Sequence, residues 1–153
     1  MKSIKKSEIK PCVIQFTEIR GFGKTVHAQD PEEYANMIKN ITNIYDNAIQ
    51  LYEGHIDKHE GKTFMATFGV PISHEEDPER AIRSALLLKQ KIKDYNTSNE
   101  TKLEVHSGIN LGKVYAGDVG SEIKKEYTVM GDPVNIAARI MEHAQGSQIL
   151  VSE

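Results

Sequence analysis

The sequence predicts an α+β fold of the ferredoxin-like type, in which helices cross one face of a mainly antiparallel sheet. Three observations support this prediction. The chain has 153 residues, which suits one compact domain with a single core. Apolar segments and turn residues follow one another in the order β-α-β-β-α-β-β-α-β. No internal repeat or linker interrupts that order, so we expect a single domain over residues 1–153.

The first half of the chain is predicted to contain a strand, a helix and a hairpin. The apolar stretch at 12–19 predicts a short buried strand. Asp30 suits the cap of the next helix and Pro31 its first position. Strands around 55–58 and 64–68 flank a tight turn. The apolar residues of the helix recur every three or four positions: Tyr34, Met37, Ile38, Ile41, Tyr45, Ala48, Ile49 and Tyr52.

The middle of the chain is predicted to contain a second helix and two further strands. The helix begins at Asp77, and the polar residues 96–100 are expected to form the loop after it. Alternation of apolar and polar residues at 103–111 predicts a half-buried strand. The pair at 112–113, Gly-Lys, is expected to turn the chain into a separate strand at 114–116.

The last part of the chain is predicted to contain a strand at 127–129, a helix that begins at Asp132, and a strand at 149–151. Pro133 suits the first turn of that helix. Many unrelated functions share a fold of this kind, so the fold does not decide the function. The residues of the loops are therefore needed to infer the function.

Composition excludes several classes of protein. An apolar share of 39% and a charged share of 27% fit a globular domain. The net charge of −3 argues against a nucleic-acid partner, which would normally meet a basic surface. No segment is apolar enough to form a signal peptide or a membrane span. Cys12, the only cysteine, is expected to be a small core residue, and we expect a cytoplasmic location.

Two segments combine charged residues with glycine turns. Residues 16–22, FTEIRGF, place Glu18 at a strand end before a turn toward a helix. Backbone N–H groups in such a turn can cradle a phosphate, although a plain strand-to-helix turn would look the same. Residues 58–69, KHEGKTFMATFG, form the second segment, which is also typical of an ordinary hairpin with charged residues at its tip. The candidate phosphate-binding loop comprises Ile19, Arg20, Gly21 and Phe22.

Two later segments carry glycines and a polar helix face. Residues 108–120, GINLGKVYAGDVG, contain four glycines within a strand pattern, which indicates bulges or close backbone approach. Residues 127–139 read YTVMGDPVNIAAR. Asn135 and Arg139 lie four positions apart and so share one face of the predicted helix. Such a pair can hold a ribose and a polyphosphate, although a lone pair of this kind is more often a surface feature.

In this order and spacing, the four segments resemble the catalytic domain of class III adenylyl and guanylyl cyclases. The resemblance runs from about residue 13 to 152, and 127–139 is its most specific part. It implies the βαββαβ core of that family and conversion of a nucleoside triphosphate into a 3′,5′-cyclic monophosphate and pyrophosphate. It also implies two divalent metals, Mg²⁺ or Mn²⁺, and a head-to-tail dimer whose active sites combine residues of both subunits.

The resemblance implies roles for four residues that one subunit supplies. Lys58 matches the base-reading lysine that is typical of adenine specificity, where guanylyl cyclases usually carry Glu. Thr128 matches the second base-reading position. Asn135 matches the residue that orients the ribose, and Arg139 the residue that stabilises the transition state. ATP is therefore the expected nucleotide.

The resemblance also places two metal-binding aspartates, and this sequence carries neither. Glu18 stands at the first position and is one methylene longer, which matters to Mg²⁺ because its geometry is strict. Lys62 stands at the second, and an ammonium group cannot ligate a metal. We expect an ion pair between Glu18 and Lys62 in place of the metals. This chain alone is expected not to bind Mg²⁺ or Mn²⁺.

Four functions remain open, in decreasing order of support. In the first, the chain supplies the base-, ribose- and transition-state-binding half of a composite adenylyl cyclase site. In the second, it is an inactive regulatory pseudocyclase that dimerises and binds ATP or no nucleotide. A homodimeric adenylyl cyclase that tolerates Glu18 and Lys62 is less favoured, and a nucleic-acid-binding domain least. The expected partner is another cyclase homology domain, in a homo- or heterodimer. The family's usual sequence continues beyond residue 153, so truncation at the C-terminus is expected.

Overall fold

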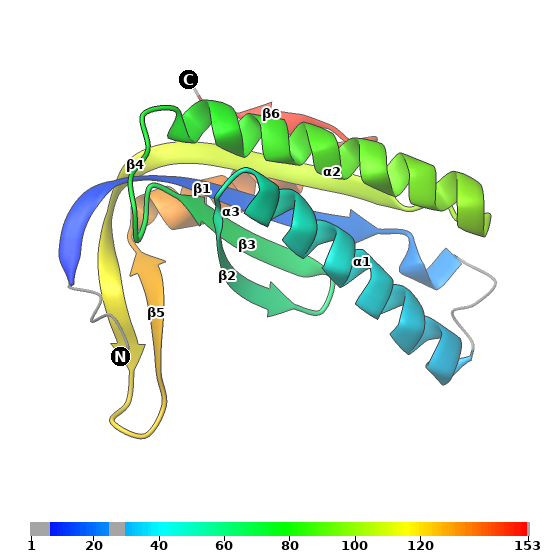
Figure 1. The fold of residues 1–153 in the computed structure, drawn as a ribbon, viewed down its shortest axis with the longest axis horizontal. Helices are drawn as coiled ribbons and strands as arrows, with labels where there is room; N and C mark the ends of the chain where they lie inside the picture. The colour runs from blue at the N-terminus through cyan, green and yellow to red at the C-terminus, as the bar shows by residue number, and fades with distance from the viewer. Residues whose placement is uncertain (1–6, 25–29, 153) are drawn as a thin grey trace.

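The computed structural model describes residues 7–24 and 30–152, and these form one sheet with helices on both sides (Figure 1). This arrangement confirms the predicted α+β class. The elements are β1 (Glu8–Arg20), the 3₁₀ turn η1 (Phe22–Lys24), α1 (Pro31–Leu51), β2 (His55–Glu60), β3 (Thr63–Phe68), α2 (Asp77–Asn99), β4 (Glu104–Gly120), β5 (Lys125–Met130), α3 (Asp132–His143) and β6 (Ile149–Val151).

The sheet has six strands, and its main path runs β2-β3-β1-β4-β5 with every neighbouring pair antiparallel. The short β6 pairs in parallel with β4 at residues 107–109. The centre of the sheet is the long pairing of β1 with β4. In this register Glu18 lies opposite Thr63 of β3 on one side and His106 of β4 on the other. The end of β1 is thereby fixed beside the β2–β3 turn.

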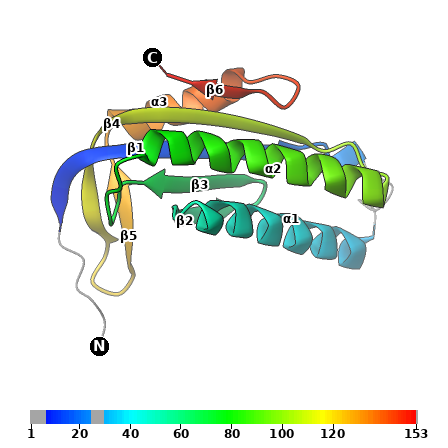
Figure 2. The same ribbon diagram turned by 45° about the horizontal axis from the view of Figure 1, so that its top comes forward.

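The helices cover both faces of the sheet, because α1 and α2 lie on one face and α3 on the other (Figure 2). The prediction that helices cross a single face therefore holds for α1 and α2 and is wrong for α3. The cause lies in β1, where both sets of alternating side chains are apolar. Val13 and Ile19 pack toward α1 and α2, whereas Cys12 and Ile14 pack with Ala137 of α3. A strand that is apolar on both faces must be covered twice.

The segment predicted as two strands separated by a turn at 112–113 is one continuous strand, β4. Gly112 stays in the ladder opposite Cys12 of β1. Its missing side chain makes room for α3, because a methyl group there would lie 2.5 Å from the ring of Pro133. The glycine therefore permits close packing of strand and helix, as the prediction of close backbone approach allowed, and it does not end the strand.

The helix boundaries were predicted correctly at the start of α1 and wrongly at the end of α2. Asp30 caps α1 by accepting hydrogen bonds from the backbone N–H groups of Glu32 and Glu33. The segment 96–100, predicted as a loop, is helical through Asn99. The amide of Asn96 bonds the backbone N–H and C=O of Leu103, so its polar groups are satisfied without leaving the helix.

Gly108 lies where α3 crosses β4, and its substitution should destabilise the fold. A methyl group at this position would lie 2.3 Å from the backbone nitrogen of Met141 and 2.6 Å from the carbonyl oxygen of Ala137. Because backbone atoms cannot rotate away, Gly108→Ala should lower the free energy of unfolding by about 3 kcal/mol. Urea denaturation measures the change. Gly23→Ala is the matched control, since no atom lies within 4 Å of the added methyl. Equal effects of the two substitutions would refute this packing.

Cys12 is a core residue, as predicted. Its side chain is 1% exposed, and burial raises the pKa of the thiol to about 12. The sulfur is therefore a neutral thiol at physiological pH and not a nucleophile. Within the described residues, no helix is long and apolar enough to cross a membrane.

Candidate functional site

The structure brings Lys58 and Thr128 together, although they lie on strands at opposite ends of the sheet path. Lys58 is on β2 and Thr128 on β5. Figure 1 shows that β4 bends strongly and carries β5 away from the plane of the other strands. Side-chain hydrogen bonds from Lys58 to Glu126 and Thr128 join β2 to β5. The Lys58 Nζ atom donates to the Thr128 Oγ1 atom at 3.3 Å. The two predicted base-reading residues thus form one polar pair.

Two carboxylates hold this pair in place. Asp57 lies beneath it with its side chain fully buried, 3.2 Å from Lys58 Nζ. Thr128 Oγ1 lies 2.9 Å and 2.8 Å from the two Asp57 oxygens. Glu126, more exposed, accepts from Lys58 at 3.1 Å. Partial burial alone would lower the pKa of Lys58, but the hydrogen bonds to Glu126 and Asp57 outweigh it and raise that pKa. The ammonium group therefore stays charged and oriented.

A pocket of 390 Å³ opens beside the pair. This volume falls in the range of small-molecule sites, which combine apolar walls with a few oriented polar groups. The lining residues are Lys58, Val119, Gly120, Lys124, Glu126, Thr128, Val129 and Met130. The pocket thus combines apolar walls from the valines and Met130 with the polar groups of Lys58 and Thr128. A pocket of 410 Å³ between α1 and α2 contains none of the predicted site residues.

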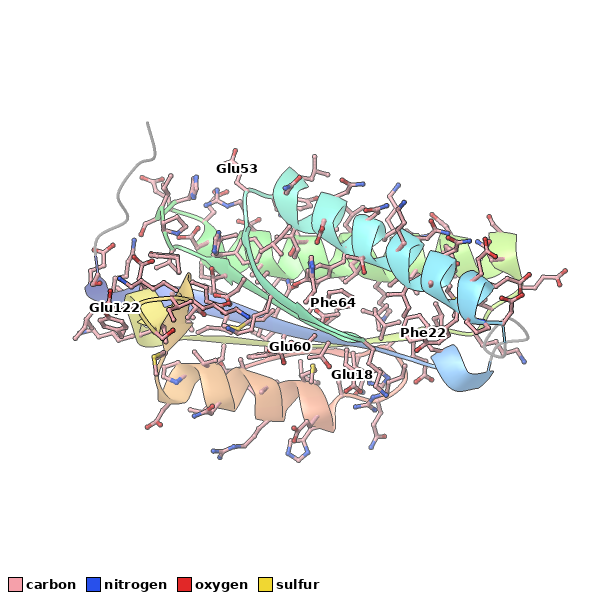
Figure 3. The ribbon with its side chains drawn as sticks, turned by 90° about the horizontal axis from the view of Figure 1, so that it is seen from below. Glu18, Phe22, Glu53, Glu60, Phe64 and Glu122 are labelled. Atoms are coloured by element: carbon pink, nitrogen blue, oxygen red, sulfur yellow. The ribbon has the colours of Figure 1, made fainter. Side chains whose placement is uncertain are left out.

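The predicted ion pair between Glu18 and Lys62 is wrong, because Glu18 pairs with Arg20. These two residues are two positions apart on β1, so their side chains leave the same face of the strand. Figure 3 shows Glu18 near the end of β1, close to the β2–β3 turn next to Glu60. Lys62, in that turn, is exposed. A backbone hydrogen bond of 2.9 Å from the Ile19 N–H to the Lys62 carbonyl ties the strand to the turn instead.

These residues do not fit a two-metal site. The Glu18 carboxylate is neutralised by the Arg20 guanidinium, and the second position holds the Lys62 ammonium. A lysine about 4 Å from a bound divalent cation would repel it by roughly 8 kcal/mol at an effective dielectric constant of 20, twice the value for two unit charges. Within residues 7–24 and 30–152, no group of three or more His, Cys, Asp or Glu side chains is placed to hold a metal ion.

The candidate phosphate-binding loop is only partly available to a ligand. The Ile19 N–H is already bonded to the Lys62 carbonyl. Gly21 adopts a φ of +106°, which favours glycine. The Phe22 side chain is 4% exposed and meets the ring of Tyr34 edge-on at 6.0 Å, so it serves the core. Figure 3 shows Phe22 farther along the chain from Glu18, toward α1.

Asn135 and Arg139 lie on α3, and both are exposed. The buried positions of this helix are Ala137 and Met141. Neither Asn135 nor Arg139 lines the pocket beside Lys58 and Thr128. One chain therefore presents two separate sets of predicted site residues, the base-reading pair in its pocket and the polar pair on α3.

Asp57 and Glu126 contact the site in the structure, but they are not among the residues predicted from the sequence. Glu126 could have been found, because it stands two positions before Thr128 on the same strand and so faces the same way. Asp57 gives no such signal. The ladder between β2 and β3 shifts between Ile56 and Lys58, so Asp57 is the extra residue of a β-bulge. Strict alternation along the strand would place its side chain opposite to that of Lys58.

Comparison with known proteins agrees with this geometry. "Adenylate cyclase 1" of Rhizobium meliloti (strain 1021) is 27% identical over 143 residues, which are 90% of this chain and 22% of that protein. The crystal structure of the adenylyl cyclase CyaB from P. aeruginosa superposes with a TM-score of 0.92 at 26% identity, covering 97% of this chain and 79% of that one. The guanylyl cyclase Cya2 superposes with a TM-score of 0.83 at 30% identity, covering 95% and 76%.

The chain spans about a quarter of the length of the curated relatives that it matches. These relatives include both adenylate and guanylate cyclases. Similarity to them therefore does not decide between an adenine and a guanine nucleotide. The model of the adenylate and guanylate cyclase catalytic domain matches residues 4–153. With that match over almost the whole sequence, the chain belongs to the class III adenylyl and guanylyl cyclase catalytic domain family.

Proposed function

We propose that this chain is the substrate-binding half of a composite adenylyl cyclase site, which converts ATP into 3′,5′-cyclic AMP and pyrophosphate. One observation carries the proposal. Lys58 and Thr128 form an oriented pair in a pocket of 390 Å³, whereas Glu18 and Lys62 do not form a metal site. The chain thus keeps the groups that hold a nucleotide and lacks those that hold the metals.

Each of the four retained residues has a distinct role in this proposal. Lys58 and Thr128 bind the polar edge of adenine. The Asn135 amide orients the ribose, so that its 3′-hydroxyl points at the α-phosphorus. The Arg139 guanidinium, with its planar set of donors, neutralises charge that develops on the phosphate oxygens in the transition state.

The partner in this proposal is a second cyclase homology domain that carries both metal-binding aspartates. It would dock head to tail and supply the Mg²⁺ or Mn²⁺ ions. The exposure of Asn135 and Arg139 supports this arrangement, because residues that act across an interface must face outward in the single chain. A cytoplasmic location, where ATP is abundant, remains our expectation.

The second candidate is a regulatory pseudocyclase that dimerises and binds ATP without turnover. The pairing of Glu18 with Arg20 favours it, because the carboxylate is neutralised without any metal. Both candidates predict an inactive isolated chain. They differ only in whether a dimer with a competent partner produces cyclic AMP.

Base preference tests the nucleotide site. Titration calorimetry of the chain should show tighter binding of ATP than of GTP, because an adenine-reading site leaves polar groups unpaired when it meets guanine. Lys58→Ala should weaken ATP binding about tenfold, since a hydrogen bond from a charged group contributes about 1.5–3 kcal/mol. Lys62→Ala is the matched control and should leave the affinity unchanged, because Lys62 lies outside the pocket. GTP binding as tight as that of ATP would overturn the assignment.

A further inference from the structure

We infer that Asp57 sets the base preference of this site by fixing the direction of the Thr128 hydroxyl proton. The inference rests on the proposed function, because it assumes that a purine occupies the pocket beside Lys58. It assigns a positioning role to a residue that does not line the pocket.

The bulge in β2 brings Asp57 to the site. Ile56 pairs with Ala66 and packs toward α1 and α2, whereas Lys58 pairs with Met65, which belongs to the cluster on the α3 side. In a regular strand, residues 56 and 58 would share a face. The extra residue breaks this alternation, so the Asp57 carboxylate and the Lys58 ammonium lie 3.2 Å apart. A bulge that re-aims a side chain in this way is common next to functional sites.

The buried Asp57 carboxylate fixes the direction of the Thr128 hydroxyl proton. An ionised carboxylate only accepts hydrogen bonds, and a hydroxyl has one proton and two lone pairs. Thr128 Oγ1 lies within 2.9 Å of both Asp57 oxygens, so its single proton points at Asp57. The Lys58 ammonium, which only donates, takes one lone pair at 3.3 Å. The second lone pair is left for a ligand.

Two donors surround the buried Asp57 carboxylate. A buried charge is costly unless it is paired and hydrogen-bonded. Asp57 has the Lys58 ammonium on one side and the Thr128 hydroxyl on the other. Both neighbours donate to it, so the Asp57 oxygens act as acceptors in this cluster.

A hydroxyl that only accepts distinguishes the two purines. At the sixth ring position adenine carries an amino group, which donates, whereas guanine carries a carbonyl oxygen, which accepts. Thr128 Oγ1 can therefore accept a hydrogen bond from adenine. The same lone pair would face the guanine oxygen without a proton between them. A site whose buried polar groups are left unpaired by the wrong substrate discriminates strongly against it.

Replacing Asp57 with asparagine tests this inference. The Asp57→Asn amide has nearly the same shape, but it can donate to Thr128 Oγ1 and so free the hydroxyl proton to point into the pocket. Titration calorimetry with ATP and GTP should show the ratio of the two affinities falling by about tenfold or more. The matched control is Asp94→Asn, which changes an exposed carboxylate on α2 and should keep the wild-type ratio.

The outcomes separate this inference from the proposed function. Wild-type protein that prefers ATP, together with a folded Asp57→Asn variant of unchanged ratio, would overturn the inference alone. Wild-type protein that binds neither nucleotide, or prefers GTP, would overturn both. A second measurement avoids any variant: NMR of the wild-type chain should show a slowly exchanging Thr128 hydroxyl proton close to the Asp57 β-protons. A freely exchanging hydroxyl would overturn the inference even if the variant fails to fold.

Discussion

Changing Arg139 to alanine should reduce the cyclase activity of a mixed dimer by about a hundredfold or more. The mixed dimer consists of this chain and a related domain that has both metal-binding aspartates but alanine at its own Asn and Arg positions. Arg139 is then the only arginine offered to the transition state of the competent site. Without it, charge on the phosphate oxygens goes uncompensated. The rate of cyclic AMP formation at saturating ATP measures the loss.

The control for this experiment is Lys62→Ala in the same mixed dimer. In the proposed arrangement Lys62 belongs to the half-site that is not used, so its removal should leave the rate unchanged. Binding of ATP should also survive Arg139→Ala better than turnover does, because an interaction made in the transition state affects kcat more than KM. A mixed dimer that loses activity equally with both substitutions would contradict the assigned roles.

The double substitution Glu18→Asp and Lys62→Asp should give the isolated chain a cyclase activity that, under our proposal, the wild-type chain lacks. It removes the ammonium group, shortens the first carboxylate and restores the acidic pair of the family. The chain already carries Lys58, Thr128 and Asn135. Because metal ions contribute several kcal/mol to reactions of this kind, cyclic AMP formation should rise at least about a hundredfold above the wild-type background.

The two single substitutions are the controls for this gain. Glu18→Asp alone leaves the Lys62 ammonium in place and should stay near background. Lys62→Asp alone leaves Glu18 paired with Arg20 and should gain less than the double variant. Strong Mn²⁺-dependent activity of the unmodified chain, abolished by Arg139→Ala, would show that Glu18 and Lys62 are tolerated and that the metal-site argument is wrong.

The fold class was predictable because local signals agree with the final packing. The cap at Asp30 and the alternation in β4 report local geometry directly. The errors arise where tertiary contacts decide. Gly112 reads as a turn, but it stays in the strand because the Pro133 ring occupies the space of its missing side chain. The polar end of α2 reads as a loop, but bonds from Asn96 to Leu103 satisfy its polar groups.

The sequence named candidate site residues, whose roles stay a prediction, but it did not give their geometry. The family resemblance named Lys58 and Thr128, and in the structure a hydrogen bond of 3.3 Å joins them. The same reasoning gave Glu18 the wrong partner, since it weighed charge and ignored that Arg20 leaves the same face of β1. Asp57 was missed because a β-bulge has no signature in a short strand of mixed residues.

Reciprocal mixing of domains tests most directly the claim that this chain supplies the substrate-binding half of a cyclase. One partner should have both metal-binding aspartates intact and alanine at its Asn and Arg positions. The other should have intact Asn and Arg and alanine at both aspartates. We expect cyclic AMP formation with the first partner, activity near background with the second, and activity near background for each protein alone. Demonstrated heterodimers that are inactive with the first partner, or equally active with both, would contradict this claim.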